Sequence, residues 1–202
     1  MRIEKSVTSL SWIPSEAIKG PMKAPFEAGF THYDEVPPDE IGDIHELRRG
    51  DRFRFVNHLT AWVEVEDGAI VDAGFGEDSG GVVNSTTVKV GPTQTVFQPG
   101  VMPELRTGPD WGAASATFTQ TTGGRTGLPA PRRVNHPPFV QWQAPLVWST
   151  LSLTIAADGT SSFEVKGASK FPRHWIYGDD RQLAAKAGMA DFKDWYHHAF
   201  GK

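Results

Sequence analysis

The chain has 202 residues, of which 39% are hydrophobic and 22% charged, and its formal net charge is −4. This composition is typical of one soluble globular domain with a sizeable core, and so small a charge argues against binding to nucleic acid or to an anionic membrane. The absence of cysteine excludes disulfides, thiolate nucleophiles and cysteine-based metal sites.

The first segment, MRIEKSVTSLSW, alternates polar and apolar residues. This alternation indicates a strand and does not fit a signal peptide, which needs a continuous apolar stretch. No part of the sequence approaches the roughly 20 consecutive apolar residues that a membrane helix requires. We therefore expect a soluble, cytoplasmic protein with no membrane partner.

Residues 52–75 contain the clearest alternation in the chain. Odd-numbered positions from 53 to 65 are mostly apolar and even-numbered positions are mostly polar, as in a strand with one buried face. Asp67-Gly68 then supplies a two-residue turn, and AIVDAGF returns as the partner strand. Asn57 interrupts the apolar face. It predicts either a buried amide that binds a ligand or a β-bulge that shifts the register.

Residues 76–81 read GEDSGG, which resembles the GDSGG loop that carries the nucleophilic serine of chymotrypsin-like proteases. The match covers five residues and has a glutamate inserted. The nearest upstream histidine, His58, is separated from Ser79 by only 20 residues and lies inside a predicted strand. In that family a much longer stretch of chain separates the two residues. We therefore interpret the segment as a glycine-rich turn.

The remaining strand predictions lie at 85–90, 93–97, 115–121 and 139–143, and in a hairpin over 146–167 with its turn at Asp158-Gly159. Consecutive hairpins predict an antiparallel, mainly β fold, and this many strands need a closed sheet or a second sheet. The sequence predicts one β-rich domain over residues 1–202, an antiparallel β-barrel or a curved β-sandwich that is lipocalin-like in size. ADFKDWYHHAF has helical periodicity, so we expect a C-terminal helical element at about 179–200.

Residues 120–138 form a long stretch rich in glycine and proline, with arginines interleaved. Long loops in compact domains often bind ligands, and a guanidinium matches the oxygens of a carboxylate or phosphate. Seven tryptophans are also available to line an apolar site. The candidate ligand-binding residues are Asn57, Trp62, Arg125, Arg132, Arg133, His136, Trp142 and Trp148.

Seven histidines raise the question of a metal site. His32, Asp34, His45 and His58 have suitable donor atoms, but no recognised metal-binding spacing connects them. We therefore predict no metal site and leave the cofactor unassigned.

The leading functional prediction is an internal cavity that binds a small apolar or aromatic molecule with an acidic group. One alternative is a cofactor-independent enzyme, such as an isomerase, cyclase or hydrolase, in which His and Asp act as acid and base in the same cavity. Another is a protein-interaction module or homodimer that uses Trp62 and Val56 as a contact face.

Overall fold

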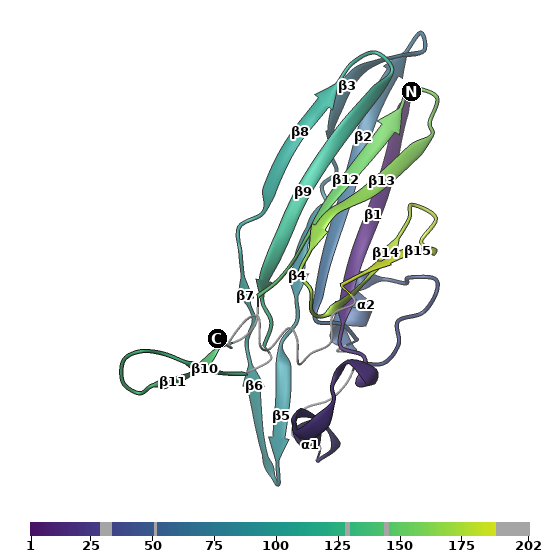
Figure 1. Ribbon diagram of the computed structural model, residues 1–202. Helices are drawn as coiled ribbons and strands as arrows, with labels where there is room; N and C mark the ends of the chain where they lie inside the picture. Colours follow the sequence, from purple (N-terminus) through teal and green to yellow (C-terminus); the bar gives the residue numbers. More distant parts are fainter. Residues whose placement is uncertain (29–33, 51, 128–129, 144–145, 189–202) are drawn as a thin grey trace.

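The computed structural model describes residues 1–28, 34–50, 52–127, 130–143 and 146–188 (Figure 1). The described chain is mainly β, and its strands pair antiparallel throughout. Two larger sheets form the body, and two separate two-stranded hairpins extend from it. The antiparallel, mainly β class predicted from the sequence is confirmed.

Sheet 1 has the order β15-β14-β1-β2-β3, and β4 also pairs with β2. Its strands are β1 (Arg2–Trp12), β2 (Phe55–Glu66), β3 (Ala69–Phe75), β4 (Gly80–Val83), β14 (Arg173–Tyr177) and β15 (Leu183–Ala187). Asp67 and Gly68 close the β2–β3 hairpin with φ values of 50° and 77°. Two consecutive positive values are typical of the tight turn that the Asp-Gly pair predicts.

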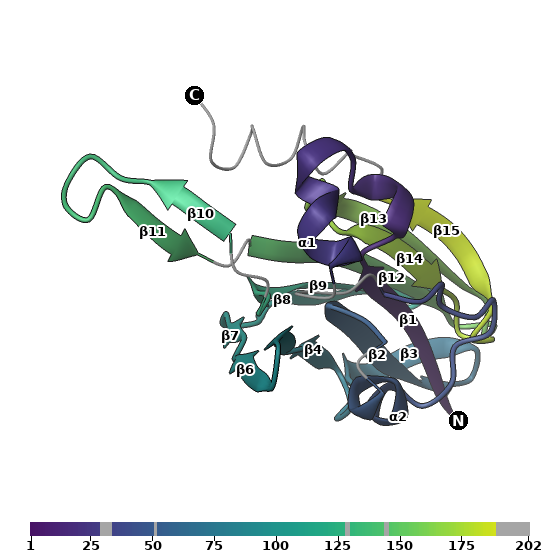
Figure 2. The same ribbon diagram turned by 90° about the horizontal axis from the view of Figure 1, so that it is seen from below.

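Sheet 2 has the order β13-β12-β9-β7, with β8 also paired to β9. Its strands are β7 (Gly100–Val101), β8 (Leu105–Trp111), β9 (Ser115–Arg125), β12 (Leu146–Ala156) and β13 (Ser161–Ala168). The separate hairpins are β5 (Thr86–Val90) with β6 (Thr93–Phe97), and β10 (Ala130–Arg133) with β11 (Val140–Gln143). Figure 2 shows the β10–β11 hairpin projecting well away from the body.

The two sheets pack face to face, and their inward side chains form the main core (Figures 1 and 2). On β2, the odd-numbered residues predicted to be apolar and inward are all buried. Pairing within the described strands does not close either sheet, so the barrel alternative is wrong and the sandwich alternative holds. The main core consists of Val7, Leu59, Ala61, Val63, Val65, Ile70, Ala116, Phe118, Leu151, Leu153, Ile155 and Ile176.

A second apolar cluster covers part of the outer face of sheet 1. Short helix α2 (Ile44–Arg49) lies beside β1 and β2, and Ile44 and Leu47 pack against this cluster. Val56 is therefore fully buried although it occupies an even-numbered position, so it offers no exposed contact face for a partner. The other short helices are η1 (Ser15–Ala17), η2 (Gly20–Lys23) and α1 (Ala24–Glu27). None of the described helices is long and apolar enough to cross a membrane.

The predicted C-terminal helical element, 179–200, is wrong in its first part. Residues Leu183–Ala187 form β15, which pairs antiparallel with β14. The sequence LAAKA has high helix propensity, but the open edge of β14 supplies hydrogen bonds that override it. Residues 189–202, which contain ADFKDWYHHAF, lie outside the described residues.

A buried ion pair joins three parts of the chain at the end of β1. Nη2 of Arg54 lies 2.9 Å from Oδ1 of Asp34, and both side chains are almost fully buried. Asp34 also accepts a hydrogen bond from the backbone N–H of Ile13, and Arg54 donates to the carbonyl of Ser85. Because each charge has several partners, the pair can remain ionised in the interior.

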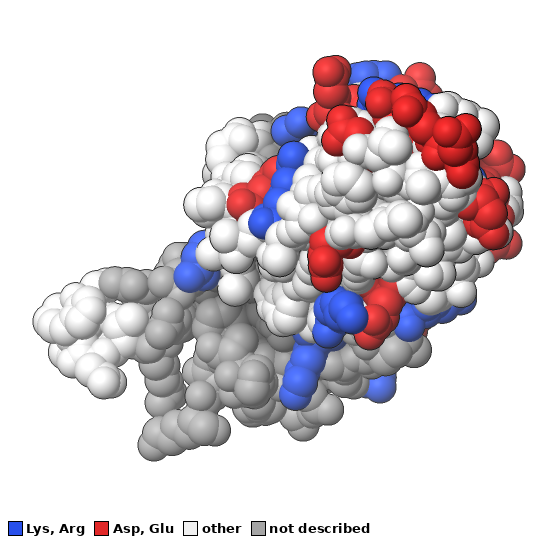
Figure 3. Space-filling view, turned by 90° about the horizontal axis from the view of Figure 1, so that it is seen from above, with Lys and Arg blue, Asp and Glu red and all other residues white. Residues whose placement is uncertain are grey.

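The end of the sandwich that carries the β2–β3 turn is acidic. Figure 3 looks onto this end, where Asp and Glu side chains gather along its borders. The β2–β3 hairpin contributes Glu64, Glu66, Asp67 and Asp72, all exposed. Like charges repel, so this surface is a poor one for an anionic ligand.

Candidate functional site

An open pocket of about 610 Å³ lies on the outer face of sheet 1. Its floor contains Thr8 of β1 with His58 and Thr60 of β2. The segment 41–45 and the turns on either side of the sheet form its walls. We call this the outer pocket; it is distinct from the packed interior between the two sheets.

The strand period places the floor residues. His58 and Thr60 are even-numbered, so they point away from the core that their odd-numbered neighbours fill. Thr8 stands directly opposite His58 in the β1–β2 register, and Gly80 stands opposite it on β4. Neither Gly80 nor Gly81 carries a side chain that would fill this end of the pocket.

His58 is held in the floor by a hydrogen bond between its Nδ1 and Oγ1 of Thr8, 2.7 Å apart. Burial lowers the pKa of His58 below its usual value of 6.5. The negative charge of Asp78 opposes this change and the positive charge of Arg181 adds to it. The imidazole is therefore neutral at pH 7, and its second ring nitrogen is available for another hydrogen bond.

Two opposite charges flank this histidine. Asp78 lies in the turn between β3 and β4, and Arg181 lies in the turn between β14 and β15. Both side chains are exposed, and within the described ranges neither has an ion-pair partner. The sheet order places β14, β1 and β2 between the two turns, so the charges stand on opposite sides of the pocket.

The backbone fixes Arg181 in a conformation that few non-glycine residues adopt. Its φ is 62°, in the left-handed region. Its N–H donates to the carbonyl of Gly178, and its own carbonyl accepts from the N–H of the adjacent Ile41, which also lines the pocket. Strained residues held by surrounding hydrogen bonds often occur at functional sites.

The hydroxyl of Thr60 is an unusual feature of the pocket floor. Thr60 is 7% exposed, and its Oγ1 is buried without a hydrogen-bond partner among the residues that the structure describes. A buried polar atom with no partner costs free energy and calls for an explanation. The oxygen is shielded from solvent, so it is no hydrogen-bond partner for a molecule in the outer pocket.

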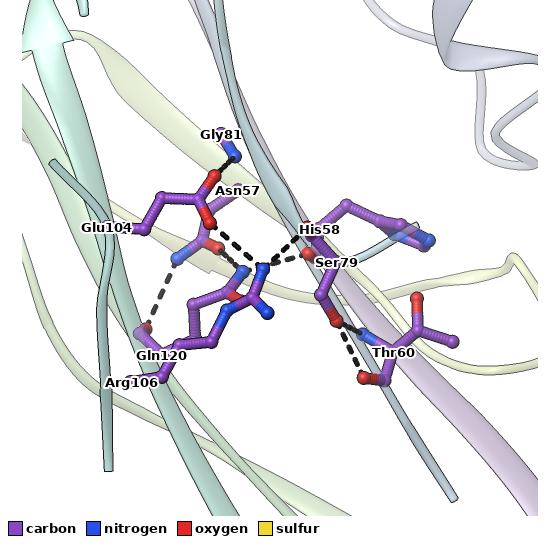
Figure 4. Close-up of polar contacts among 8 residues, drawn as sticks. All are labelled: Asn57, His58, Thr60, Ser79, Gly81, Glu104, Arg106 and Gln120. Carbon is purple, nitrogen blue, oxygen red and sulfur yellow. Dashed lines mark hydrogen bonds and ion pairs between the residues drawn. The ribbon is translucent and has the colours of Figure 1, made fainter. Parts of the chain in front are cut away.

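Ser79, the serine of GEDSGG, is committed to the backbone of β2. Its Oγ donates to the carbonyl of Thr60 at 2.6 Å and accepts from the N–H of Thr60 at 2.8 Å (Figure 4). The ring of His58 points away from this hydroxyl (Figure 4). The segment is the turn between β3 and β4, so the turn prediction is confirmed. Ser79 has a hydrogen-bonding role in joining this turn to β2.

Replacing Ser79 with alanine is expected to lower the free energy of unfolding by about 1–3 kcal/mol, because it leaves the buried N–H of Thr60 without its partner. The carbonyl of Thr60 also loses one donor and keeps the N–H of Gly76. Urea unfolding measures this change. Ser161→Ala, at an exposed position on β13, is the control and is expected to stay within about 0.5 kcal/mol of the wild type. Equal stabilities for the two variants would contradict the role given to Ser79.

Asn57 lies in the interior between the sheets. Its Nδ2 donates to the carbonyl and the hydroxyl of Ser149, and its Oδ1 accepts from Nε2 of Gln120 at 2.9 Å. Asn57 pairs regularly with Ser9 and Gly81, so no bulge occurs at this position. The protein itself provides the hydrogen-bond partners that the sequence led us to seek in a ligand.

The interior network continues to the wall of the outer pocket. Arg106 of β8 donates from Nε to Oε1 of Gln120 and from Nη2 to the carbonyl of Ser79. Glu104 pairs with Arg106 and accepts from the N–H of Gly81 at 2.9 Å. These contacts tie segment 79–81 to sheet 2 (Figure 4). They thereby hold the turn that carries Asp78.

The other predicted site residues lie on elements dispersed over the molecule, and none is among the described residues that line the outer pocket. Trp62 is half-buried on the outer face of sheet 1, where Arg2 stacks on its ring, and Trp148 packs beside Gly167 on sheet 2. The exposed Arg125 ends β9. The remaining four belong to the projecting hairpin: Arg132 and Arg133 on β10, Trp142 on β11 and the exposed His136 between them.

Sequence reasoning did not single out Asp78 or Arg181, and it weighed His58 as a catalytic partner of Ser79 and as a metal donor but not as a ligand-binding residue. Among the described residues, no group of three or more His, Asp or Glu side chains is arranged to hold a metal ion. The even-numbered position of His58 was the available signal that it faces away from the core. Nothing in the sequence indicated that residues 8, 58, 78 and 181 would meet.

No protein-family model matches the chain, and comparisons with curated proteins and with solved structures found no match. A function for this protein must therefore be argued from the chemistry of the outer pocket itself.

Proposed function

We propose that the protein binds a small organic molecule with an acidic group and an apolar body, and that this molecule occupies the outer pocket. The observation that carries the proposal is Arg181, which lines the pocket near His58 and has no ion-pair partner among the described residues. A guanidinium can bind both oxygens of a carboxylate at once.

The rest of the pocket supports the same class of ligand. Ile41, Ile44 and Val82 supply apolar surface in the walls, and the floor supplies the polar residues Thr8 and His58. Ligand sites usually combine apolar walls with a few polar groups that fix orientation. This proposal keeps the ligand class expected from the sequence and moves its site from an internal cavity to the outer face of sheet 1.

An acid–base enzyme acting in the same pocket is the second candidate. It is favoured by His58, whose pKa is lowered and whose ring is oriented by Thr8. A neutral imidazole beside a carboxylate such as Asp78 can accept a proton from a bound substrate. Binding is the simpler proposal, since catalysis would also require a reacting group within reach of the free ring nitrogen.

The test of binding uses 3-phenylpropanoate, which has one carboxylate and an apolar ring. Isothermal titration calorimetry would measure its affinity, and the NMR signal of the His58 ring, assigned with His58→Gln, would report its position. Replacing Arg181 with glutamine is expected to weaken binding about 10-fold or more, because each charged hydrogen bond contributes about 1.5–3 kcal/mol.

Arg49→Gln is the matched control, because Arg49 is an exposed arginine on α2 that pairs with Glu46. This variant is expected to bind the probe as the wild type does. The proposal fails if no phenylpropanoate, with or without further substituents, shifts the His58 signal. It also fails if Arg181→Gln and Arg49→Gln bind equally well.

A further inference from the structure

Two side chains of opposite charge, Asp78 and Arg181, line the outer pocket. A ligand with only an acidic group can form an ion pair with Arg181 but not with Asp78. Asp78 lines the same pocket as Arg181, and an acid alone would meet repulsion from its carboxylate. Asp43, another carboxylate of the pocket, already accepts hydrogen bonds from the N–H groups of His45 and Glu46 at the start of α2. Asp78 has no such partner among the described side chains and backbone groups.

The positions of Asp78 and Arg181 are set independently. Arg181 is fixed by backbone hydrogen bonds to Gly178 and Ile41, whereas Asp78 sits in a turn held by Ser79 and, through segment 79–81, by Arg106 and Glu104. Both charges also affect His58, which lies between them: Asp78 raises the pKa of the imidazole and Arg181 lowers it. Two opposite charges that are both near one imidazole but not paired with each other leave room for a molecule that bridges them.

We propose that the ligand of the outer pocket is a zwitterion, an amino acid or a closely related amino carboxylate with an apolar side chain. This inference rests on the proposed function. The carboxylate of the ligand pairs with Arg181, and its ammonium group pairs with Asp78. The neutral His58 is a hydrogen-bond partner for the same polar end, and Ile41, Ile44 and Val82 contact the side chain.

Three probes that share one phenylethyl body separate the two charges. L-Phenylalanine has both the amine and the carboxylate, 3-phenylpropanoate has only the carboxylate, and 2-phenylethylamine has only the amine. Calorimetry at pH 7.5 would give the affinity of each. We expect L-phenylalanine to bind about 10-fold tighter than either single-charge probe, as an added charged hydrogen bond implies.

Asp78→Asn tests the role of the acid directly. This variant is expected to bind L-phenylalanine about 10-fold more weakly, because the ammonium group loses its partner. Its affinity for 3-phenylpropanoate is expected to be unchanged or higher, because a charge that repels the carboxylate has been removed. Glu77→Gln changes the neighbouring exposed carboxylate and is expected to leave all three affinities unchanged. Asp78 is exposed in a turn, so the Asn variant is expected to fold, which circular dichroism would check.

The outcomes separate this inference from the proposed function. If 3-phenylpropanoate binds as tightly as L-phenylalanine, or if Asp78→Asn weakens both equally, the zwitterion inference is overturned and acid binding stands. If 2-phenylethylamine binds as tightly as L-phenylalanine, the carboxylate is not recognised and both proposals fail. Both also fail if no probe binds.

Discussion

Replacing Asp34 with alanine is expected to lower the free energy of unfolding by about 3–5 kcal/mol, the largest effect of any substitution considered for this protein. The change removes the carboxylate that pairs with Arg54, whose side chain is 2% exposed and cannot be rehydrated without opening the fold. It also removes the acceptor for the backbone N–H of Ile13. The positive charge of Arg54 then stays in the interior without the Asp34 carboxylate, which is costlier than the loss of the pair itself.

Glu35→Ala provides the control for this prediction. Glu35 is the next residue along the chain, and it pairs with Arg52 where both side chains are largely exposed. Exposed pairs contribute about 0–1 kcal/mol, so this variant is expected to stay close to the wild type in urea unfolding. The double variant Asp34→Leu/Arg54→Met is expected to lose less stability than Asp34→Ala. Equal losses for Asp34→Ala and Glu35→Ala would contradict the structure of this pair.

Acidification from pH 7 to pH 4 is expected to remove about 3 kcal/mol of stability through His174 alone. The imidazole is fully buried, and burial lowers its pKa from 6.5 to about 4, with a hydrogen bond to the carbonyl of Ser169 partly opposing this. Between these two values the unfolded chain binds a proton that the folded chain does not. The contribution is therefore fully present above about pH 6.5 and is lost as the pH falls towards 4.

Other groups titrate in the same pH range, including His58, whose pKa is also lowered. Comparing the pH dependence of stability between variants separates the contribution of His174 from theirs. His174→Gln is expected to be less stable at pH 7, because the ring also contacts Ser11 and Ser169, and to have a flatter dependence of stability on pH. His136→Gln, at an exposed position on the projecting hairpin, is expected to keep the wild-type dependence. If His174→Gln loses as much stability as the wild type between pH 7 and pH 4, the account of His174 is wrong.

The sequence was sufficient to predict the local structure of the sandwich. Strand periodicity placed the odd-numbered residues of β2 in the core, and the Asp67-Gly68 pair marked its hairpin, because both signals depend only on neighbouring residues. LAAKA was the exception, since its pairing with β14 depends on a sheet edge that local sequence cannot reveal. Whether the sheet closed into a barrel also depended on contacts between distant strands.

The same distinction applies to the candidate site. Asn57 was correctly identified as a polar residue on a buried face, but its partners Gln120 and Ser149 are 63 and 92 residues away. Thr8 reaches His58 across 50 residues, and Arg181 comes from a turn near the other end of the chain. Residue types alone favoured the arginines of the 120–138 stretch, whereas the fold places Arg132 and Arg133 on a hairpin outside the sandwich.

The most direct test of ligand binding in the outer pocket is a crystal structure of the protein grown with L-phenylalanine. The account predicts electron density for the amino acid over Thr8 and His58, with its carboxylate within hydrogen-bond distance of the Arg181 guanidinium and its ammonium group facing Asp78. Density for the ligand beside Arg132 and Arg133 instead, or an outer pocket filled only with water, would contradict it.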